Sequence, residues 1–278
     1  MTKSTSRFLR IFSTYLPVLL IVLFAMAPYI WTFLSSITPE TDLYTREFHF
    51  VPERPTLNNY VRLFTKIHFA RNIIDSIFIA VATAIFGLII TVPASYSFSR
   101  FRFRGRKMML MQFLGINMFP IMLLIIPLFI IMKNLRLMDT HLALIIAYST
   151  MAIPFSVWML TSFFNSIPTE LDQAAMIDGC SGMQVMLRVT IPIAMPGIIS
   201  TGIYIFITAW NEFLYAAILT SSRVRTIPVA LQNMIGEYQI EWGLLTAGGI
   251  VSALPVIVLF FFIQRHLISG MTSGAIKG

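Results

Sequence analysis

Two adjacent polar residues, Asn211 and Glu212, interrupt one of the long apolar runs of this sequence. A charged residue at the centre of a membrane helix costs about 2.5–3.5 kcal/mol, so it usually faces a cavity or a partner group. Amide and carboxylate groups can hydrogen-bond the hydroxyl groups of a polar solute, and Trp210 or Tyr215 can stack on a ring. These four residues are therefore a candidate lining for a solute pathway. The alternative is that Glu212 lies near the outer end of its helix and is solvated or structurally paired.

The other groups that could do chemistry are isolated from one another. Asp75 precedes a second apolar run and is expected at a helix start, where a carboxylate favours the positive end of the helix dipole. Cys180 is the only cysteine, which excludes an intrachain disulfide and a cysteine-based metal site. The sequence contains no glycine-rich phosphate loop ending in Lys-Ser/Thr and no credible Ser/His/Asp set, so we expect neither an enzyme nor a cofactor. The four histidines lack metal-ligand spacing: His49, His68, His141 and His266.

The composition is that of a membrane protein. Hydrophobic residues make up 57% of the 278 residues and charged residues only 12%, with a mean hydropathy of +0.79. Soluble domains carry about 25% charged residues, so the low charge indicates a chain that crosses the membrane several times. The net charge of +8 comes from basic residues that lie between apolar runs, as orientation signals do, and not from a nucleic-acid-binding face.

Six apolar runs have the length of about 20 residues that a bilayer-crossing helix requires. We therefore predict an all-α integral membrane protein with one transmembrane domain over residues 1–278. Pro120 and Pro127 lie inside the third run and are expected to mark bends. The predicted spans are about 15–34, 76–98, 108–132, 142–164, 193–219 and 245–264.

Basic residues predict the orientation. Residues 100–107 contain five Lys or Arg, whereas residues 133–140, at the other end of the third span, contain two. Cytoplasmic loops carry the excess of Lys and Arg, so 100–107 is predicted to be cytoplasmic. Both termini and the loop after the fourth span then lie inside. Residues 35–71, an ordered loop by their Pro and Asn content, and residues 221–242 lie outside.

The cytoplasmic stretch 167–196 is the longest polar and small-residue interruption in the second half of the chain. Thr169, followed three residues later by Asp172, predicts a helix start. Gly179 is placed where a left-handed cap would end that helix, because glycine takes this conformation without a steric penalty. Ser181 can cap a second helix. The stretch therefore predicts a helix, a sharp turn and another helix that project from the membrane.

This stretch resembles the signature loop of the membrane subunits of ABC-type importers. That pattern is Glu-Ala-Ala, three residues, Gly, nine residues, Ile, one residue and Leu-Pro. Here Gln173-Ala174-Ala175, Gly179, Val189 and Ile191-Pro192 fall at those spacings, with Gln173 in place of the usual glutamate. The carbohydrate-uptake branch of the family has segments similar to Asp178-Gly179, Pro196-Gly197, the Arg-Phe-Arg-Phe-Arg-Gly of 100–105, Ala209-Trp210-Asn211-Glu212-Phe213 and the closing residues 273–278.

The resemblance implies that residues 167–188 form a coupling helix that docks on a cytoplasmic ATPase. It further implies a second homologous permease, two ATP-binding subunits and an extracytoplasmic sugar-binding protein in a bacterial or archaeal cell membrane. The implied ATPase-coupling residues are Glu170, Asp172, Gln173, Ala174, Ala175, Asp178, Gly179 and Pro192. The implied tail contact with the ATPase consists of Gly274, Ala275, Ile276, Lys277 and Gly278.

Two other classes of protein remain to be weighed. A proton-coupled secondary transporter could use Glu212 and Asp75 as relays, but it would not need a docking loop ended by Gly179. A purely structural membrane anchor would leave the intramembrane pair of Asn211 and Glu212 unexplained.

Overall fold

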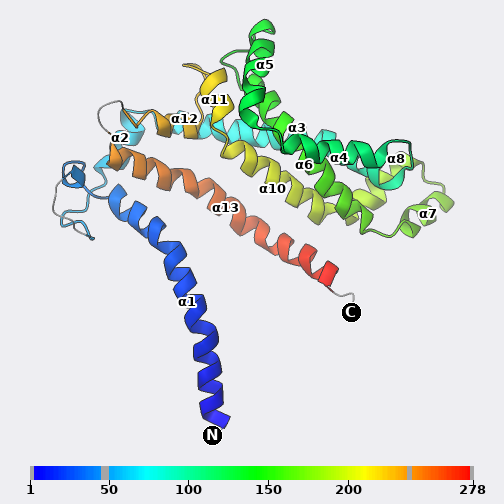
Figure 1. Ribbon diagram of the computed structural model, residues 1–278, viewed down its shortest axis with the longest axis horizontal. Helices are drawn as coiled ribbons and strands as arrows, with labels where there is room; N and C mark the ends of the chain where they lie inside the picture. Colours follow the sequence, from blue (N-terminus) through cyan, green and yellow to red (C-terminus); the bar gives the residue numbers. More distant parts are fainter. Residues whose placement is uncertain (1–2, 45–49, 237–239, 276–278) are drawn as a thin grey trace. The chain divides into compact units, whose positions relative to one another are not determined.

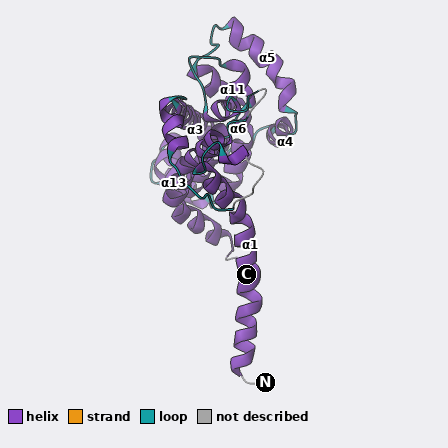
Figure 2. Ribbon diagram, turned by 90° about the vertical axis from the view of Figure 1, so that its left-hand side faces the viewer, coloured by secondary structure: helices purple, strands orange, loops and turns teal. Residues whose placement is uncertain are grey.

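The protein is all-helical in the residues that the structure describes. This computed structural model describes residues 3–44, 50–236 and 240–275, and side chains within those ranges from residue 13 to residue 261. In these ranges the only β-type contact is an isolated bridge between Ile235 and Ile240 (Figures 1 and 2). The predicted all-α class is confirmed. The chain divides into two units. Unit 1 comprises residues 1–69 and 231–254, and unit 2 comprises residues 70–230 and 255–278.

Four helices in the described residues are long and apolar enough to cross a membrane, and the number is six if each of two bent helix pairs forms one span. The bent pairs are α4 with α5, at 95°, and residues 182–193 with α10, at 79°. The four long helices are α1 (Lys3–Ser36), α3 (Phe69–Arg100), α6 (His141–Asn165) and α13 (Trp242–Ala275).

The third predicted span is sharply bent. It consists of α4 (Arg106–Asn117) and α5 (Ile121–Asn134), which meet at 95°. Pro120 stands at the start of α5 with φ −60° and ψ 120°. Because proline lacks an N–H and disfavours helical geometry in the residue before it, α4 cannot continue through this point. Pro127 lies inside α5 without ending it, so only the first of the two expected bends breaks the helix.

The fifth predicted span, 193–219, is not one continuous helix. The structure divides it into α10 (Met195–Trp210) and α11 (Leu214–Leu219). The side chain of Glu212 accepts hydrogen bonds from the first backbone N–H groups of α11, which allows a new helix to start immediately after the break.

The core of unit 2 lies between α3, α6 and α10. Ser95 of α3 donates its hydroxyl to the carbonyl oxygen of Val157 in α6 at 3.1 Å. Gly197 lets α10 approach α6 closely, because a Cβ there would lie 2.5 Å from the ring of Phe163. A buried cluster then continues toward the loop after α6. It comprises Tyr96, Leu160, Phe164, Ile167, Met186 and Ala194.

Unit 1 contains the predicted ordered loop after the first span. Its helix α2 (Asn58–Thr65) is held by buried Asn59, whose side-chain amide donates to the carbonyl oxygens of Ser36 and Thr38. Arg62 of α2 donates to Glu241 at 2.9 Å. A single 3-10 turn, η1 (Asp42–Tyr44), also lies in this loop. Hydrogen bonds and an ion pair therefore order the loop.

Candidate functional site

The stretch after α6 forms the predicted helix–turn–helix, which we call the coupling loop (residues 167–193). Its first helix is α7 (Glu170–Ile177). Gly179 follows with φ +88°, and its N–H donates to the carbonyl of Met176 at 3.1 Å while that of Cys180 donates to Ala175 at 3.0 Å. These two bonds satisfy the last carbonyls of α7 in a Schellman motif. The predicted left-handed cap at Gly179 is confirmed.

The second helix of the coupling loop starts at the predicted cap. Ser181 accepts a hydrogen bond from the N–H of Gln184 at 3.4 Å, and the side chain of Gln184 accepts from the N–H of Ser181 at 2.8 Å. This reciprocal pair is a capping box. The helix then runs as α8 (Gly182–Val185), the π-helical turn η2 (Met186–Thr190) and α9 (Ile191–Ile193).

Helix α7 starts at the predicted position but without a side-chain cap. Thr169 stands at the capping position, but its side chain makes no capping hydrogen bond. The carboxylate of Asp172 turns inward: Oδ2 lies 2.5 Å from Nε of Arg100, and Oδ1 accepts from the hydroxyl of Thr190 at 2.8 Å. Asp172 was predicted to help start the helix and to contact the ATPase. In this chain its carboxylate is buried, because an oppositely charged group at the end of α3 pairs with it.

Arg100 connects the coupling loop to two of the long helices. It ends α3, and its Nη1 donates to the carbonyl oxygen of Phe164 in α6 at 3.0 Å. The side chains of Arg100 and Asp172 are only 8% and 7% exposed. Removing one partner of such a pair would leave a buried charge uncompensated. The sequence indicated Arg100 only as one of five basic residues in a loop, since no local signal pairs it with a residue 72 positions away.

The remaining predicted coupling residues lie on the surface. The structure also exposes apolar side chains beside the turn, which the sequence analysis missed: Ile177 is 86% exposed and Met183 is 63% exposed. Their position on either side of the glycine cap was the available signal. Exposed apolar side chains within a charged rim are typical of a protein-binding surface. The exposed predicted residues are Glu170, Gln173, Ala174, Asp178, Gly179 and Pro192, and Ala175 is half-buried.

The four predicted pathway residues meet at the break between α10 and α11. Glu212 is 7% exposed, and its two carboxylate oxygens accept from the N–H groups of Tyr215 at 2.9 Å and Ala216 at 3.3 Å. Tyr215 is buried, and the ring of Trp210 stacks on Phe206 with centroids 5.7 Å apart. Glu212 therefore caps α11.

Asn211 differs from the other three because its side chain is exposed. Its amide donates to the carbonyl oxygen of Ile207 at 2.9 Å. Of the predicted pathway residues, only Asn211 is exposed on the surface of this chain.

Asp75 was expected at the start of its helix, and the structure places it elsewhere. Helix α3 begins at Phe69, and Asp75 lies in its second turn with Oδ1 2.8 Å from Nε2 of His141. Nε of Arg71 lies 4.0 Å from the other oxygen. The carboxylate is therefore positioned by a histidine and an arginine and not by the helix dipole.

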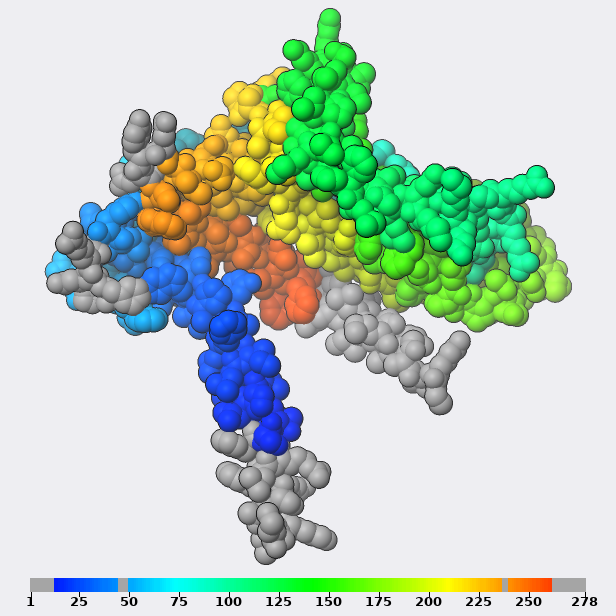
Figure 3. Space-filling model, viewed as in Figure 1, coloured from blue at the N-terminus to red at the C-terminus, as the bar shows by residue number. Residues whose placement is uncertain are grey.

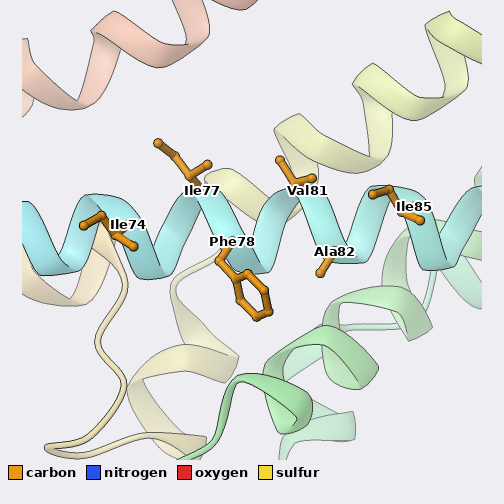
Figure 4. Close-up of a pocket in the computed structure, with 6 residues that line it drawn as sticks. All are labelled: Ile74, Ile77, Phe78, Val81, Ala82 and Ile85. Atoms are coloured by element: carbon orange, nitrogen blue, oxygen red, sulfur yellow. The ribbon is translucent and has the colours of Figure 1, made fainter.

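An apolar pocket of about 420 Å³ lies along α3 (Figure 4). All of its lining side chains come from this helix and none carries a polar atom that could hydrogen-bond a sugar. The pocket is therefore a feature of an apolar helix face and not a solute site. The lining residues are Ile74, Ile77, Phe78, Val81, Ala82 and Ile85.

The predicted tail contact falls at the edge of the described structure. The backbone of Gly274 and Ala275 belongs to the last turn of α13. Ile276, Lys277 and Gly278 lie outside the described residues.

The fold and the coupling loop define an all-helical membrane permease, and comparison with known proteins agrees. Residues 84–273 match the family model described as "Binding-protein-dependent transport system inner membrane component". The chain belongs to this family, which confirms the resemblance noted in its signature loop. It is a transport subunit and not an enzyme, and its family works with a partner permease, an ATPase and a substrate-binding protein.

Three curated relatives cover most of the chain. It is 36% identical to the trehalose transport system permease protein SugB of Mycobacterium tuberculosis, over 96% of this chain and 98% of the relative. It is 34% identical to the sulfoquinovosyl glycerol transport system permease protein SmoH of Agrobacterium fabrum, over 90% and 88%. It is 33% identical to the trehalose/maltose transport system permease protein MalG of Thermococcus litoralis, over 94% of each chain.

A solved structure shares the fold. It is a bacterial ABC transporter involved in the import of the acidic polysaccharide alginate, and the comparison has a TM-score of 0.77. It covers 95% of this chain and 98% of the other, with 23% sequence identity. At this identity the likeness establishes the architecture alone.

Proposed function

We propose that this chain is one permease subunit of an ATP-driven importer that takes up a carbohydrate. A second homologous permease, two ATP-binding subunits and an extracytoplasmic sugar-binding protein complete the complex. The similarity to permeases named for trehalose, maltose and sulfoquinovosyl glycerol supports a carbohydrate as the solute. Residues Gly274 to Gly278 are a proposed second contact with the ATPase, on the strength of the family resemblance.

The coupling loop is the observation that carries this proposal. It exposes Ile177 and Met183 beside acidic Glu170 and Asp178. Apolar anchors surrounded by charges suit a reversible interface, in which a few buried side chains supply most of the affinity. We place this surface in a cleft of the cytoplasmic ATPase.

The Arg100–Asp172 pair explains how movement of the coupling loop reaches the membrane. Its contacts join α7 to the ends of α3 and α6, and Thr190 adds a hydrogen bond from η2. A loop tied at several points moves with the helices that hold it. When ATP draws the two ATPase subunits together, each coupling loop carries its helices along, and the two permeases rock about a central pathway.

The break after Trp210 suits a position on that pathway. Within a bilayer, backbone that is not helical is tolerated only where it is buried in protein or lines an aqueous cavity. Asn211 is exposed at this break, whereas Glu212 holds the start of α11. We assign Asn211 a direct contact with the sugar, and Glu212, Trp210 and Tyr215 the task of positioning it.

The basic residues support an orientation of the chain in the membrane. We place the coupling loop, residues 100–107 and both termini in the cytoplasm of a prokaryotic cell, with the chain in the inner membrane. The five-to-two excess of Lys and Arg in 100–107 over 133–140 supports this orientation.

A proton-coupled transporter is less consistent with the contacts. Both of its candidate relays have structural partners: Asp75 pairs with His141, and Glu212 caps α11. A docking loop would have no role in such a protein.

Uptake by reconstituted vesicles tests the proposed function. The complete complex is inserted into liposomes, and radiolabelled trehalose or maltose is added outside with the purified binding protein. We expect uptake that requires both enclosed ATP and the binding protein, and that a protonophore leaves unchanged. Vesicles that enclose ADP are the control. Uptake without ATP that collapses when the proton gradient is removed would overturn the proposal.

A further inference from the structure

A carboxylate organises the loop that follows α11. We call residues 220–226, between α11 and α12 (Ile227–Gln232), the arginine loop. The carboxylate of Asp139, from the turn before α6, lies inside its curve. It accepts hydrogen bonds of 2.8–3.2 Å from the hydroxyl of Ser221 and from four successive backbone N–H groups, those of Ser221, Ser222, Arg223 and Val224.

The first turns of α3 hold the arginine loop from another side. Arg71 donates to the carbonyl oxygen of Arg223 at 2.9 Å, and Asn72 donates to that of Arg225 at 3.0 Å. The N–H of Ile227, directly after the loop, donates to the hydroxyl of Ser76 at 2.8 Å. Most backbone polar groups of the loop are thus satisfied within the protein, and its shape is fixed before any partner arrives.

The fixed loop presents cations to the surface. The side chains of Arg223 and Arg225 are exposed, and that of Arg71 is 71% exposed. In the described part of the chain no carboxylate lies within 4.0 Å of the guanidinium group of Arg223 or Arg225. The carboxylate of Asp139 is occupied by the loop backbone.

The neighbouring segments add to this charge. Five Lys or Arg and two carboxylates lie in the three segments around the loop, which are residues 71–76, 133–141 and 221–227. Both carboxylates, Asp75 and Asp139, accept hydrogen bonds from within unit 2. The surface around the arginine loop is therefore net positive.

We propose that Arg71, Arg223 and Arg225 form a docking surface for an acidic face of the extracytoplasmic binding protein. This inference rests on the proposed function and on the predicted position of residues 221–242 outside the membrane, where the binding protein docks, and it specifies the chemistry of the contact. The acidic face supplies carboxylates that pair with the exposed guanidinium groups, which suit planar, bidentate recognition.

A protein partner fits this loop better than a lipid surface does. Amphipathic segments that insert into the membrane interface combine basic residues with exposed aromatic or aliphatic side chains. The one large apolar residue of the arginine loop, Val224, is 3% exposed, so the loop has nothing to insert. A loop fixed by hydrogen bonds also lowers the entropy cost of binding a partner of definite shape.

Opposite charges would mainly accelerate association. Complementary surfaces raise the rate of encounter between proteins, and this advantage falls as salt increases. A binding protein that must dock and leave in every transport cycle benefits from fast and reversible contact.

The test measures ATP hydrolysis by the complete complex in nanodiscs of phosphatidylcholine, titrated with the purified binding protein of the same transport system. We expect the Arg223→Glu/Arg225→Glu variant to need at least ten times more binding protein for half-maximal stimulation. Hydrolysis without binding protein should be unchanged, and the difference between the variants should shrink in 0.5 M salt. The matched control, Arg223→Lys/Arg225→Lys, keeps the charges and should stay within about threefold of the wild type.

Three results would contradict the proposal. The double Glu variant could respond to the binding protein as the wild type does. The loss could persist at high salt, which would indicate a distorted loop. The loss could appear only in discs that contain phosphatidylglycerol, which would assign the arginines to lipid. A wild-type complex that no binding protein stimulates would instead contradict the proposed function itself.

Discussion

Arg100 and Asp172 join the end of α3 to the first helix of the coupling loop, with Nε and Oδ2 2.5 Å apart. The opposite end of α3 holds the arginine loop through Arg71. At 1.5 Å per residue, the 29 steps from Arg71 to Arg100 span about 43 Å. Figures 1 and 3 show α7 at the end of unit 2 that is remote from α11. One continuous helix therefore contacts both the proposed ATPase surface and the proposed outer docking surface.

The ion pair should determine how firmly the coupling loop is held. Asp172→Ala leaves the guanidinium of Arg100 buried without its partner, which costs about 3–5 kcal/mol when a buried pair is broken. We expect a lower unfolding temperature and faster proteolysis within the coupling loop of the purified subunit. Asp178→Ala removes the same charge from an exposed position and should change the unfolding temperature and the rate of proteolysis little. Equal behaviour of the two variants would show that the pair does not hold the loop.

Local signals predicted the coupling loop, and distant contacts could not be predicted. Gly179 and Ser181 act on their own chain neighbours, so spacing alone located the turn and both helices. The partner of Asp172 lies 72 residues earlier, and only the packed helices bring the two together. Glu212 was recognised as a costly group in a span, but its role as a cap depends on a helix break that hydropathy does not register.

The break in span five makes a second prediction. Glu212→Ala removes the cap of α11, which costs about 0.5–2 kcal/mol, and it should reduce sugar uptake while the complex still assembles. Glu212→Gln keeps one acceptor oxygen and should retain more uptake.

Asn211→Ala should raise the substrate concentration for half-maximal uptake without lowering the unfolding temperature. Uptake kinetics and thermal unfolding measure these effects, and unaltered uptake in both alanine variants would remove the pair from the pathway.

Cys180 reports the orientation of the coupling loop. It is the only cysteine and is half-buried directly after the turn at Gly179. A membrane-impermeant thiol reagent should label it in inverted vesicles and leave it unlabelled in intact cells. A Cys180→Ser chain provides the background signal. Labelling from outside intact cells would reverse the proposed topology.

Asp139 makes a prediction about pH. Partial burial raises its pKa, but hydrogen bonds from the backbone N–H groups of Ser221 and Arg223, the Ser221 hydroxyl and Val224 outweigh this and hold the pKa well below its usual value. A carboxyl group with a lowered folded-state pKa stabilises the protein above its unfolded pKa of about 3.9, and this stabilisation is lost as pH falls further.

The variant Asp139→Asn should therefore unfold at a lower temperature than the wild type by the same amount at every pH from 5 to 8. The difference should narrow only below about pH 4, where the wild-type carboxyl group begins to bind protons in the unfolded state. Thermal unfolding of the purified complex across this range measures it. If the difference in unfolding temperature between variant and wild type disappeared between pH 8 and pH 5, the hydrogen bonds of the loop would not hold the carboxylate of Asp139 in its charged form.

Retention of the ATPase by Gly179 variants tests the coupling loop most directly. Gly179 has φ +88°, and beyond its two chain neighbours nothing lies within 4 Å of the place a Cβ would take, so a substitution there acts through backbone strain. Gly179→Val should cost about 1–3 kcal/mol and distort the turn, whereas Gly179→Asn should be tolerated because asparagine adopts this conformation more readily. Gln173→Glu, on the exposed side of α7, should also be tolerated.

The measurement is co-purification of the ATPase with each membrane-inserted variant, together with ATP-dependent sugar uptake. We predict that Gly179→Val inserts normally, retains little ATPase and transports no sugar. Gly179→Asn and Gln173→Glu should co-purify with the ATPase and take up sugar as the wild type does. Full ATPase retention and normal uptake by Gly179→Val would contradict the central role of the coupling loop.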